Sequence, residues 1–346
     1  MHTPTNASPK AYYEIDTAFI PGQHFPAALI DLALSRGIES HKIFKHTRIF
    51  YEDLRDPTAR VSPAQCLQLI QNIQKQHNSH DLSFLLGHRL LPGNFGATST
   101  LCINAIHLQD ALENLQYLYA ILTPLLRPRL VYEENNLAIY WQDTCGAEDS
   151  LEFLVEMMFS AVTGISRWLS GATLPWNYFF TYYQPAHIEQ YDVNFGAQTH
   201  FNALHNKMVI AREHIYKPWL KASPSVAFIA KQESTASLNA LPAQQSFLAS
   251  IYDYLHQHIH LDPNLDQTAS DFYMSSASLK RKLQKHHTHF QAQYDAVRKD
   301  LALYWMNQEG MSNEQIASRL HFHDAANLRR AFKKWTGLTP MALKLR

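Results

Sequence analysis

The spacing of apolar residues in the first two thirds of the chain predicts several helices. In four stretches apolar side chains recur every three or four residues, which places them on one face of a helix. The clearest is the third, where six apolar positions from Leu108 to Leu122 share a face. The four predicted helices cover residues 26–35, 63–76, 108–122 and 150–169.

Other stretches in the same region have the alternating pattern of strands. Residues 130–132 and 137–141 alternate on either side of the polar run Glu-Glu-Asn-Asn, which predicts a β-hairpin. Two more strands are predicted at 176–182 and 206–211, the second after a Phe-Gly turn at 195–196. Helices and strands together predict an α+β domain.

The pattern changes near Lys217. A stretch rich in Pro, Ser, Ala and Gln follows, in which we expect a short helix from Ser225 and then a flexible piece to Gln245. From there to the end, the apolar pattern is helical throughout. The expected division is a flexible N-terminus (1–22), an α+β domain (23–231), a linker (232–245) and an all-α domain (246–346).

Two segments of the all-α domain, 269–283 and 317–332, resemble each other. Each has a small residue in a short helix, one apolar residue in a turn, a polar residue that can cap the next helix, and a basic second helix. This is the pattern of a helix-turn-helix, in which the small residue allows close helix packing. The small residues are Ala269 and Ala317, and the turn residues are Met274 and Phe322.

The second helix of each segment is expected to have a buried and a basic face. The buried positions are Leu279 with Leu283, and Leu328 with Phe332. Between the two segments, residues 290–308 form one continuous helical stripe that would fix the separation of the two motifs. The sequence therefore predicts two helix-turn-helix motifs joined by a long helix, a layout that can reach successive major grooves about 34 Å apart.

The charge distribution agrees with a nucleic-acid partner. The chain has 30 basic and 30 acidic residues, but residues 276–346 hold 13 Lys and Arg against five Asp and Glu. The rest of the chain holds 17 basic and 25 acidic residues. A basic segment of this kind is typical of DNA binding, although a solvated basic surface would give the same count.

These motifs resemble the DNA-binding domain of the AraC/XylS family of transcription regulators. The resemblance covers about one hundred residues, and its most specific stretch is RAFKKWTGLTP at 330–340. The first domain resembles, less strongly, the arabinose-binding-like effector domain of one branch of the family, through PGNFG at 92–96 and the segment from 195 to 218. The resemblance implies a transcription regulator that binds promoter DNA.

The resemblance also implies which side chains meet DNA. In the first reading helix Ala277, Lys280 and Arg281 would face the bases. In the second, the residues that would face the bases or the neighbouring backbone are Ala325, Ala326, Asn327, Arg329 and Arg330. Arg would select bases, and Lys334 would bind phosphate without selectivity. The complete expected set is Ser276, Ala277, Ser278, Lys280, Arg281, Lys285, Ala325, Ala326, Asn327, Arg329, Arg330, Lys333 and Lys334.

Two positions depart from the family pattern. Tyr273 and His321 stand in the two turns where relatives usually have Gly. A non-Gly residue at positive φ costs about 1–2 kcal/mol, so we expect these turns to have a different shape. Ala277 and Ala325 are small where relatives often have longer side chains, which favours apolar contacts such as a thymine methyl.

No other chemistry is indicated. The 20 histidines include clusters at 256–260, 286–289 and 321–323, but none has the spacing of a zinc site, so no metal and no cofactor are expected. No catalytic motif is found, which argues against an enzyme. The three cysteines, odd in number and far apart, are expected to be buried thiols. Without a signal sequence or a long apolar run, a cytoplasmic protein without membrane contact is expected.

The expected function is therefore a DNA-binding regulator controlled by a small effector in the first domain. Aromatic residues there could line an apolar pocket or form plain core, and a small apolar or amphipathic effector is preferred. They are Phe95, Trp141, Trp168, Trp176, Phe179, Phe180, Tyr182 and Tyr183. The other expected partners are RNA polymerase and a second copy in a homodimer. The alternative is an effector-independent DNA-binding protein whose first domain only dimerises.

Overall fold

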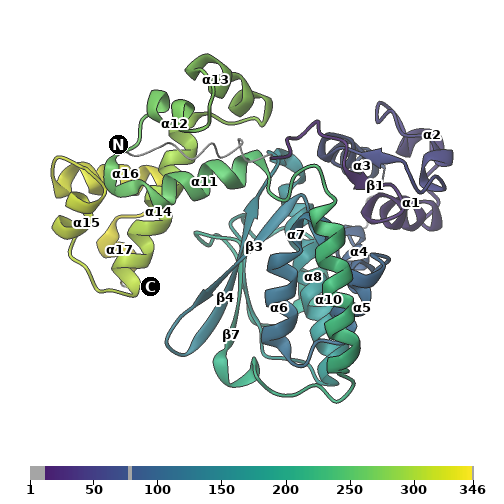
Figure 1. The fold of residues 1–346 in the computed structure, drawn as a ribbon. Helices are drawn as coiled ribbons and strands as arrows, with labels where there is room; N and C mark the ends of the chain where they lie inside the picture. Colours follow the sequence, from purple (N-terminus) through teal and green to yellow (C-terminus); the bar gives the residue numbers. More distant parts are fainter. Residues whose placement is uncertain (1–11, 77–79, 345–346) are drawn as a thin grey trace, which may run out of the picture. The chain divides into compact units, whose positions relative to one another are not determined.

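The computed structural model describes residues 12–76 and 80–344. The chain forms two compact units, one of Tyr13–Ser246 and one of the residues from Phe247 onward together with Tyr12 (Figure 1). Both sheets belong to the first unit, and the described part of the second unit consists of helices and turns. The predicted order, an α+β domain followed by a helical one, is confirmed.

The first unit contains all four predicted helices. The predicted helix 108–122 is interrupted at Leu118, and four short helices were not foreseen (α2, α4, α5 and α9). Its helices are α1 (Phe25–Ser35), α2 (Ser40–Ile43), α3 (Pro63–Gln74), α4 (Leu82–Leu90), α5 (Ala97–Ile103), α6 (Leu108–Tyr117), α7 (Tyr119–Leu122), α8 (Leu151–Ser170), α9 (Ile188–Phe195) and α10 (Pro224–Asn239), with 3-10 turns at Tyr51–Leu54, Glu148–Ser150 and Arg212–His214.

The main sheet has five strands in the order β3-β4-β7-β5-β6. The predicted hairpin is confirmed: β3 and β4 pair antiparallel, with Leu130 opposite Ile139. In the picture α6 lies beside this ribbon (Figure 1), and it contacts β3. The strands are β1 (Ile20–Pro21), β2 (Arg60–Val61), β3 (Leu126–Tyr132), β4 (Asn136–Asp143), β5 (Asn177–Phe179), β6 (Thr199–His200) and β7 (Lys207–Ala211), of which β1 and β2 form a separate pair.

The centre of this unit is α8, which is buried on nearly all sides from Phe153 to Val162. A helix that is apolar all round belongs in a core rather than at a surface. It packs closely against α4 because Gly87 has no side chain. A Cβ at that position would lie 2.2 Å from the Met157 carbonyl oxygen and 2.6 Å from Ser160 Cβ.

Two expectations about the ends of this unit are wrong. Residues 232–239, expected to be flexible linker, are the second half of α10, which packs along α5. Residues 12–22, expected to be a flexible N-terminus, are part of the fold. Tyr13 is buried, its hydroxyl donates to the Pro124 carbonyl at 2.9 Å, and Ile20 pairs with Val61; residues 1–11 lie outside the described range.

The second unit contains seven helices within the described residues. They are α11 (Phe247–Gln257), α12 (Leu265–Asp271), α13 (Ser276–Lys285), α14 (Phe290–Asn307), α15 (Asn313–Arg319), α16 (Ala325–Thr336) and α17 (Pro340–Lys344), with a 3-10 turn at Ile259–Leu261. In the described chain, no helix is both long enough and apolar enough to cross a bilayer.

Candidate DNA interface

The first helix-turn-helix consists of α12 and α13. Ala269 is buried where the two helices meet, and Leu279 and Leu283 are fully buried under α13. The Ser275 side chain accepts a hydrogen bond from the Ser278 amide at 3.2 Å and so caps α13. Such a cap contributes about 1 kcal/mol to helix stability, and it fixes where the reading helix begins.

The second motif, α15 and α16, repeats this construction. Ala317, Leu328 and Phe332 are buried, and the Asp324 carboxylate accepts from the Asn327 amide at 2.6 Å. The N-terminus of α15 has a reciprocal capping box between Ser312 and Gln315. The predicted buried positions and caps are therefore correct in both motifs. The turn residues Met274 and Phe322 are only half-buried.

The two turns keep the left-handed backbone despite their unusual residues. Tyr273 has φ 55° and His321 has φ 57°, both in the region that favours glycine. The expectation that the turns would change shape is therefore wrong, and each residue bears the conformational cost instead. The His321 ring nitrogen Nε2 donates to the His260 carbonyl at 3.1 Å, which partly offsets that cost, whereas the Tyr273 side chain is 71% exposed.

The side chains expected to contact DNA lie mostly at the surface. On α13, Ala277, Lys280, Arg281 and Lys285 are exposed, and Ser276 and Ser278 are half-buried. On α16 the exposed members of the set are Ala326, Arg329, Arg330, Lys333 and Lys334, while Ala325 and Asn327 are half-buried.

Several of these side chains have partners within their own motif. Arg281 donates to Ser278 Oγ on α13 at 3.4 Å, Arg330 donates to Asn327 Oδ1 on α16, and Ser276 on α13 donates to Asp266 on α12. Hydrogen bonds between exposed groups exchange readily with water or a phosphate, because their net contribution is only about 0.5–1.5 kcal/mol. The arginines are therefore directed along the reading helices and remain available to DNA.

A polar joint connects the long helix α14 to both motifs. The Arg298 guanidinium lies 4.1 Å from the ring centre of Tyr294 and 4.9 Å from that of Phe322, which stands in the second turn. It also pairs with Asp262 at 3.2 Å, and its side chain is only 13% exposed. Asp262 lies three residues before α12, so the Arg298 side chain links the segment that leads into the first motif to the turn of the second. Figure 1 shows α14 running between the two motifs.

Sequence reasoning missed the part played by Tyr12 in this unit. Its ring centre lies 5.1 Å from that of Phe247 on α11 and 6.3 Å from that of Phe272 at the end of α12. The ammonium of Lys282 on α13 lies over the Tyr12 ring at 5.4 Å. Tyr12 lies more than two hundred residues from these partners in the sequence, so no local pattern indicates this packing.

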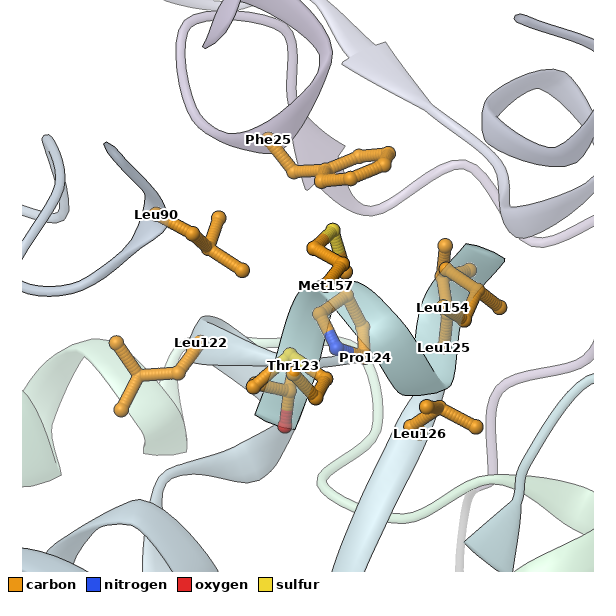
Figure 2. Close-up of a pocket in the computed structure, with 10 residues that line it drawn as sticks. Phe25, Leu90, Leu122, Thr123, Pro124, Leu125, Leu126, Leu154 and Met157 are labelled. Atoms are coloured by element: carbon orange, nitrogen blue, oxygen red, sulfur yellow. The ribbon is translucent and has the colours of Figure 1, made fainter. Parts of the chain in front are cut away.

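One apolar cavity in the first unit is too small for an effector. The cavity in Figure 2 is lined by Phe25, Leu90, Met157 and neighbouring apolar side chains, and its volume is about 10 Å³. A single water needs about 10–15 Å³, so no organic molecule fits. The aromatic residues predicted for a pocket have different environments. Four are buried core (Phe95, Trp141, Trp176 and Phe180), two are half-buried (Phe179 and Tyr182), and two are exposed (Trp168 and Tyr183).

Neither metal nor thiol chemistry is evident in the part of the chain that is described. The histidines there form no group with other ligands that could hold a metal ion. The three cysteines are buried free thiols, as predicted, and burial raises the pKa of Cys102 to about 12. A thiol with such a pKa stays protonated and is unreactive.

Two protein families match the chain. The family described as the arabinose-binding domain of the AraC transcription regulator matches residues 37–218, and a helix-turn-helix domain family matches residues 268–346. The first range contains the five-stranded sheet and α8, and the second covers both helix-turn-helix motifs from within α12 onward. The resemblance inferred from the sequence is confirmed.

Individual proteins agree with the families. The chain is 27% identical over 317 residues to the ornithine utilization regulator of Pseudomonas aeruginosa, which spans 91% of this chain and 94% of that protein. It is 21% identical over 140 residues to an uncharacterized HTH-type transcriptional regulator of Mycobacterium tuberculosis, which spans 40% of this chain and 41% of that protein. Among solved structures, the transcriptional regulator CdpR of Pseudomonas aeruginosa covers 93% of this chain and 98% of its own, with 16% identity and a TM-score of 0.44.

The family assignment follows from coverage, because the arabinose-binding-domain family alone spans more than half of the sequence. The arabinose-binding-domain family and the two sequence relatives named above are those of regulators rather than enzymes. The chain belongs to the AraC family: it is a DNA-binding transcription regulator with an N-terminal ligand-binding domain.

Proposed function

We propose that the protein reads a promoter sequence through α13 and α16, each in one of two successive major grooves. The observation that carries this proposal is the duplicated motif, whose two reading helices bury matching positions and expose matching basic ones. Arg281, Arg329 and Arg330 would select bases, and Lys333 and Lys334 would hold phosphates. The other members of the set would contact bases or adjacent backbone: Ser276, Ala277, Ser278, Lys280, Lys285, Ala325, Ala326 and Asn327.

The joint at Arg298 supports reading as one rigid pair. If α14 and its contacts fix the separation of the two helices, DNA with half-sites about one helical turn apart, about 34 Å, fits best. We further propose that the protein acts in the cytoplasm as a homodimer and contacts RNA polymerase at the promoter. The residues around 240–246, between α10 and α11, would form the boundary between the effector domain and the reader.

For control, we propose a small apolar or amphipathic effector bound by the first unit. The family of that unit supports a ligand, and a relative named for the utilisation of ornithine supports a small metabolite. The cavity at Met157 is too small to receive it, so the site lies elsewhere in the unit or opens on binding. The second candidate is a DNA-binding protein without an effector, whose first unit only dimerises. The small volume of the cavity at Met157 is the observation that favours it.

The test is selection of bound duplexes from a random library with the full-length protein at two salt concentrations. We expect a motif with two short half-sites, because bases are read by both helices, and weaker binding at the higher salt. Binding that depends on salt but yields no motif, with and without cell metabolites, would contradict sequence-specific reading. Loss of binding to the selected DNA when metabolites are added, or its gain, would favour the effector-controlled candidate over the second one.

A further inference from the structure

A buried carboxylate lies in the most apolar helix of the effector unit. Glu156, on the second turn of α8, is 7% exposed among residues that are almost all core. Its Oε2 accepts a hydrogen bond from Ser83 Oγ on α4 at 2.5 Å, and its Oε1 accepts one from the Tyr191 hydroxyl on α9. The carboxylate therefore sits where three helices meet.

This carboxylate has little positive charge beside it. Over the described residues, the one basic side chain with a nitrogen within 4.0 Å of its oxygens is His187, at 4.0 Å. Buried carboxylates are ordinarily paired with a full positive charge, because hydroxyl donors replace only part of the lost hydration. The negative charge of Glu156 also affects neighbouring groups. The pKa values of Tyr182 and Glu152 are raised, mainly by burial and secondly by repulsion from Glu156.

Aromatic rings pack around Tyr191, one of the two hydroxyl donors to the carboxylate. The Tyr191 ring makes edge-on contacts with Phe84, Phe180 and Phe201 at centroid distances of 5.0–5.2 Å. The Tyr182 hydroxyl lies 3.1 Å from that of Tyr191, and its ring lies 5.3 Å from Phe180. Aromatic faces attract organic cations, and rings grouped about a carboxylate are the typical receptor for an ammonium group.

The site also has an approach from solvent. The His187 side chain is 21% exposed and stacks on His80, and Glu152, one helical turn before Glu156, is exposed. An incoming cation would pass the exposed carboxylate and take the place that the imidazole now occupies. His187 and Tyr182 are half-buried, so both lie at the rim of the cluster.

We propose that Glu156, with the rings of Tyr182 and Tyr191, binds the ammonium group of a small amphipathic organic cation. The apolar part of the ligand packs against Phe180 and Phe201. The inference rests on the proposed control by an effector and narrows its chemical class to an organic ammonium ion. The single charge in the otherwise apolar helical stretch FLVEMMF, at 153–159, is the sequence signal that marks this site.

The test compares four probes of equal length on the full-length protein: hexylammonium, hexyltrimethylammonium, hexanol and hexanoate. Binding is measured by calorimetry and by the shift of the melting temperature. We expect one or both ammonium ions to bind and raise the melting temperature, and hexanol and hexanoate to leave it unchanged. Hexanol binding as tightly as the ammonium ions, or no ammonium ion binding, would overturn the inference.

Variants distinguish a ligand site from a structural one. Glu156→Gln keeps the shape and removes the charge, so we expect ammonium binding about tenfold weaker or worse. Glu134→Gln, in the exposed turn between β3 and β4, removes the same charge outside the cluster; it is the control and should stay within about twofold of wild type. If Glu156→Gln does not unfold cooperatively, Tyr182→Leu replaces it, with loss of binding expected for hexyltrimethylammonium. Unchanged binding in the variant used would refute the site.

The outcome is separate from that of the proposed function. If the random-library selection yields a motif and a metabolite without a positive charge shifts DNA binding, control by an effector stands and the ammonium site falls. If no motif is obtained but Glu156→Gln abolishes ammonium binding, the site stands and the proposal for DNA reading falls.

Discussion

Replacement of Tyr273 by Gly is expected to stabilise the DNA-binding unit. Tyr273 holds φ 55° in the turn of the first motif, and its side chain is 71% exposed. A non-Gly residue in this region costs about 1–2 kcal/mol, and Gly removes that cost. Gly also gains freedom in the unfolded chain, which opposes folding by about 0.5–1 kcal/mol. The net gain is about 0.5–1 kcal/mol, since little side-chain packing is lost.

The second turn provides an internal comparison. His321 has nearly the same φ, 57°, but its ring donates a hydrogen bond to the His260 carbonyl at 3.1 Å. Such a bond contributes about 0.5–1.5 kcal/mol, so His321→Gly should change stability by about zero. A gain at Tyr273 and none at His321 would separate the backbone cost from the side-chain contribution.

Differential scanning calorimetry of the full-length protein measures both variants, with the transition of the DNA-binding unit followed in each. For a domain of this size, 1 kcal/mol moves the melting temperature by about 4–8 °C, so Tyr273→Gly should raise it by about 2–8 °C. Tyr273→Ala is the control, because Ala keeps the Cβ and hence the strain. A melting temperature for Tyr273→Gly equal to or below that of Tyr273→Ala would refute the reasoning.

Three further predictions concern DNA reading and pH. Arg281→Ala should weaken binding to the selected DNA more than binding to random DNA, whereas Lys334→Ala should weaken both alike. Filter binding to the two duplexes measures this difference. Equal losses of affinity for Arg281→Ala would show that Arg281 does not read bases. Arg298→Met should flatten the preference for one half-site spacing in duplexes lengthened or shortened by a base pair, and an unchanged preference would mean that α14 alone sets the spacing. Burial, with the charge of Arg60, lowers the pKa of His24 to about 4, so the folded state keeps it neutral while the unfolded state is protonated below about pH 6.5. Stability of the effector unit should therefore fall by about 1–2 kcal/mol between pH 7 and pH 5, and His24→Phe should reduce that fall in denaturant titrations.

Much of the DNA-binding unit could be predicted because its determinants are local. Ser275 and Asp324 cap helices that start at the next residue, and Ala269 and Leu279 lie within one short motif. Such signals are complete within about twenty residues, and here they occur twice. The turns at Tyr273 and His321 were misjudged because the motif's packing holds them in the left-handed conformation despite the residue type.

The effector unit was less predictable because its helices are short and its contacts are distant in sequence. The helices α4, α5 and α9 have seven to nine residues each, too few for a periodic pattern to stand out. The continuation of α10 through residues 232–239 was missed because its Ser- and Ala-rich sequence is also typical of linkers. Burial against α5 stabilises it as a helix, and neither propensity nor pattern contains that information.

Arg298 and Glu156 show why charged residues were the hardest to interpret. In the sequence each lies in a helical stretch, and the ordinary expectation for such a charge is a solvated face. In the structure both are largely buried, yet their partners differ in kind: Arg298 has a carboxylate and two rings, whereas Glu156 has hydroxyls and one distant imidazole. A buried charge paired with an opposite charge stabilises a fixed arrangement, and a carboxylate held mainly by hydroxyl donors is suited to receive a cation from outside. Arg298 therefore fits the proposed DNA reader, and Glu156 fits the proposed effector site.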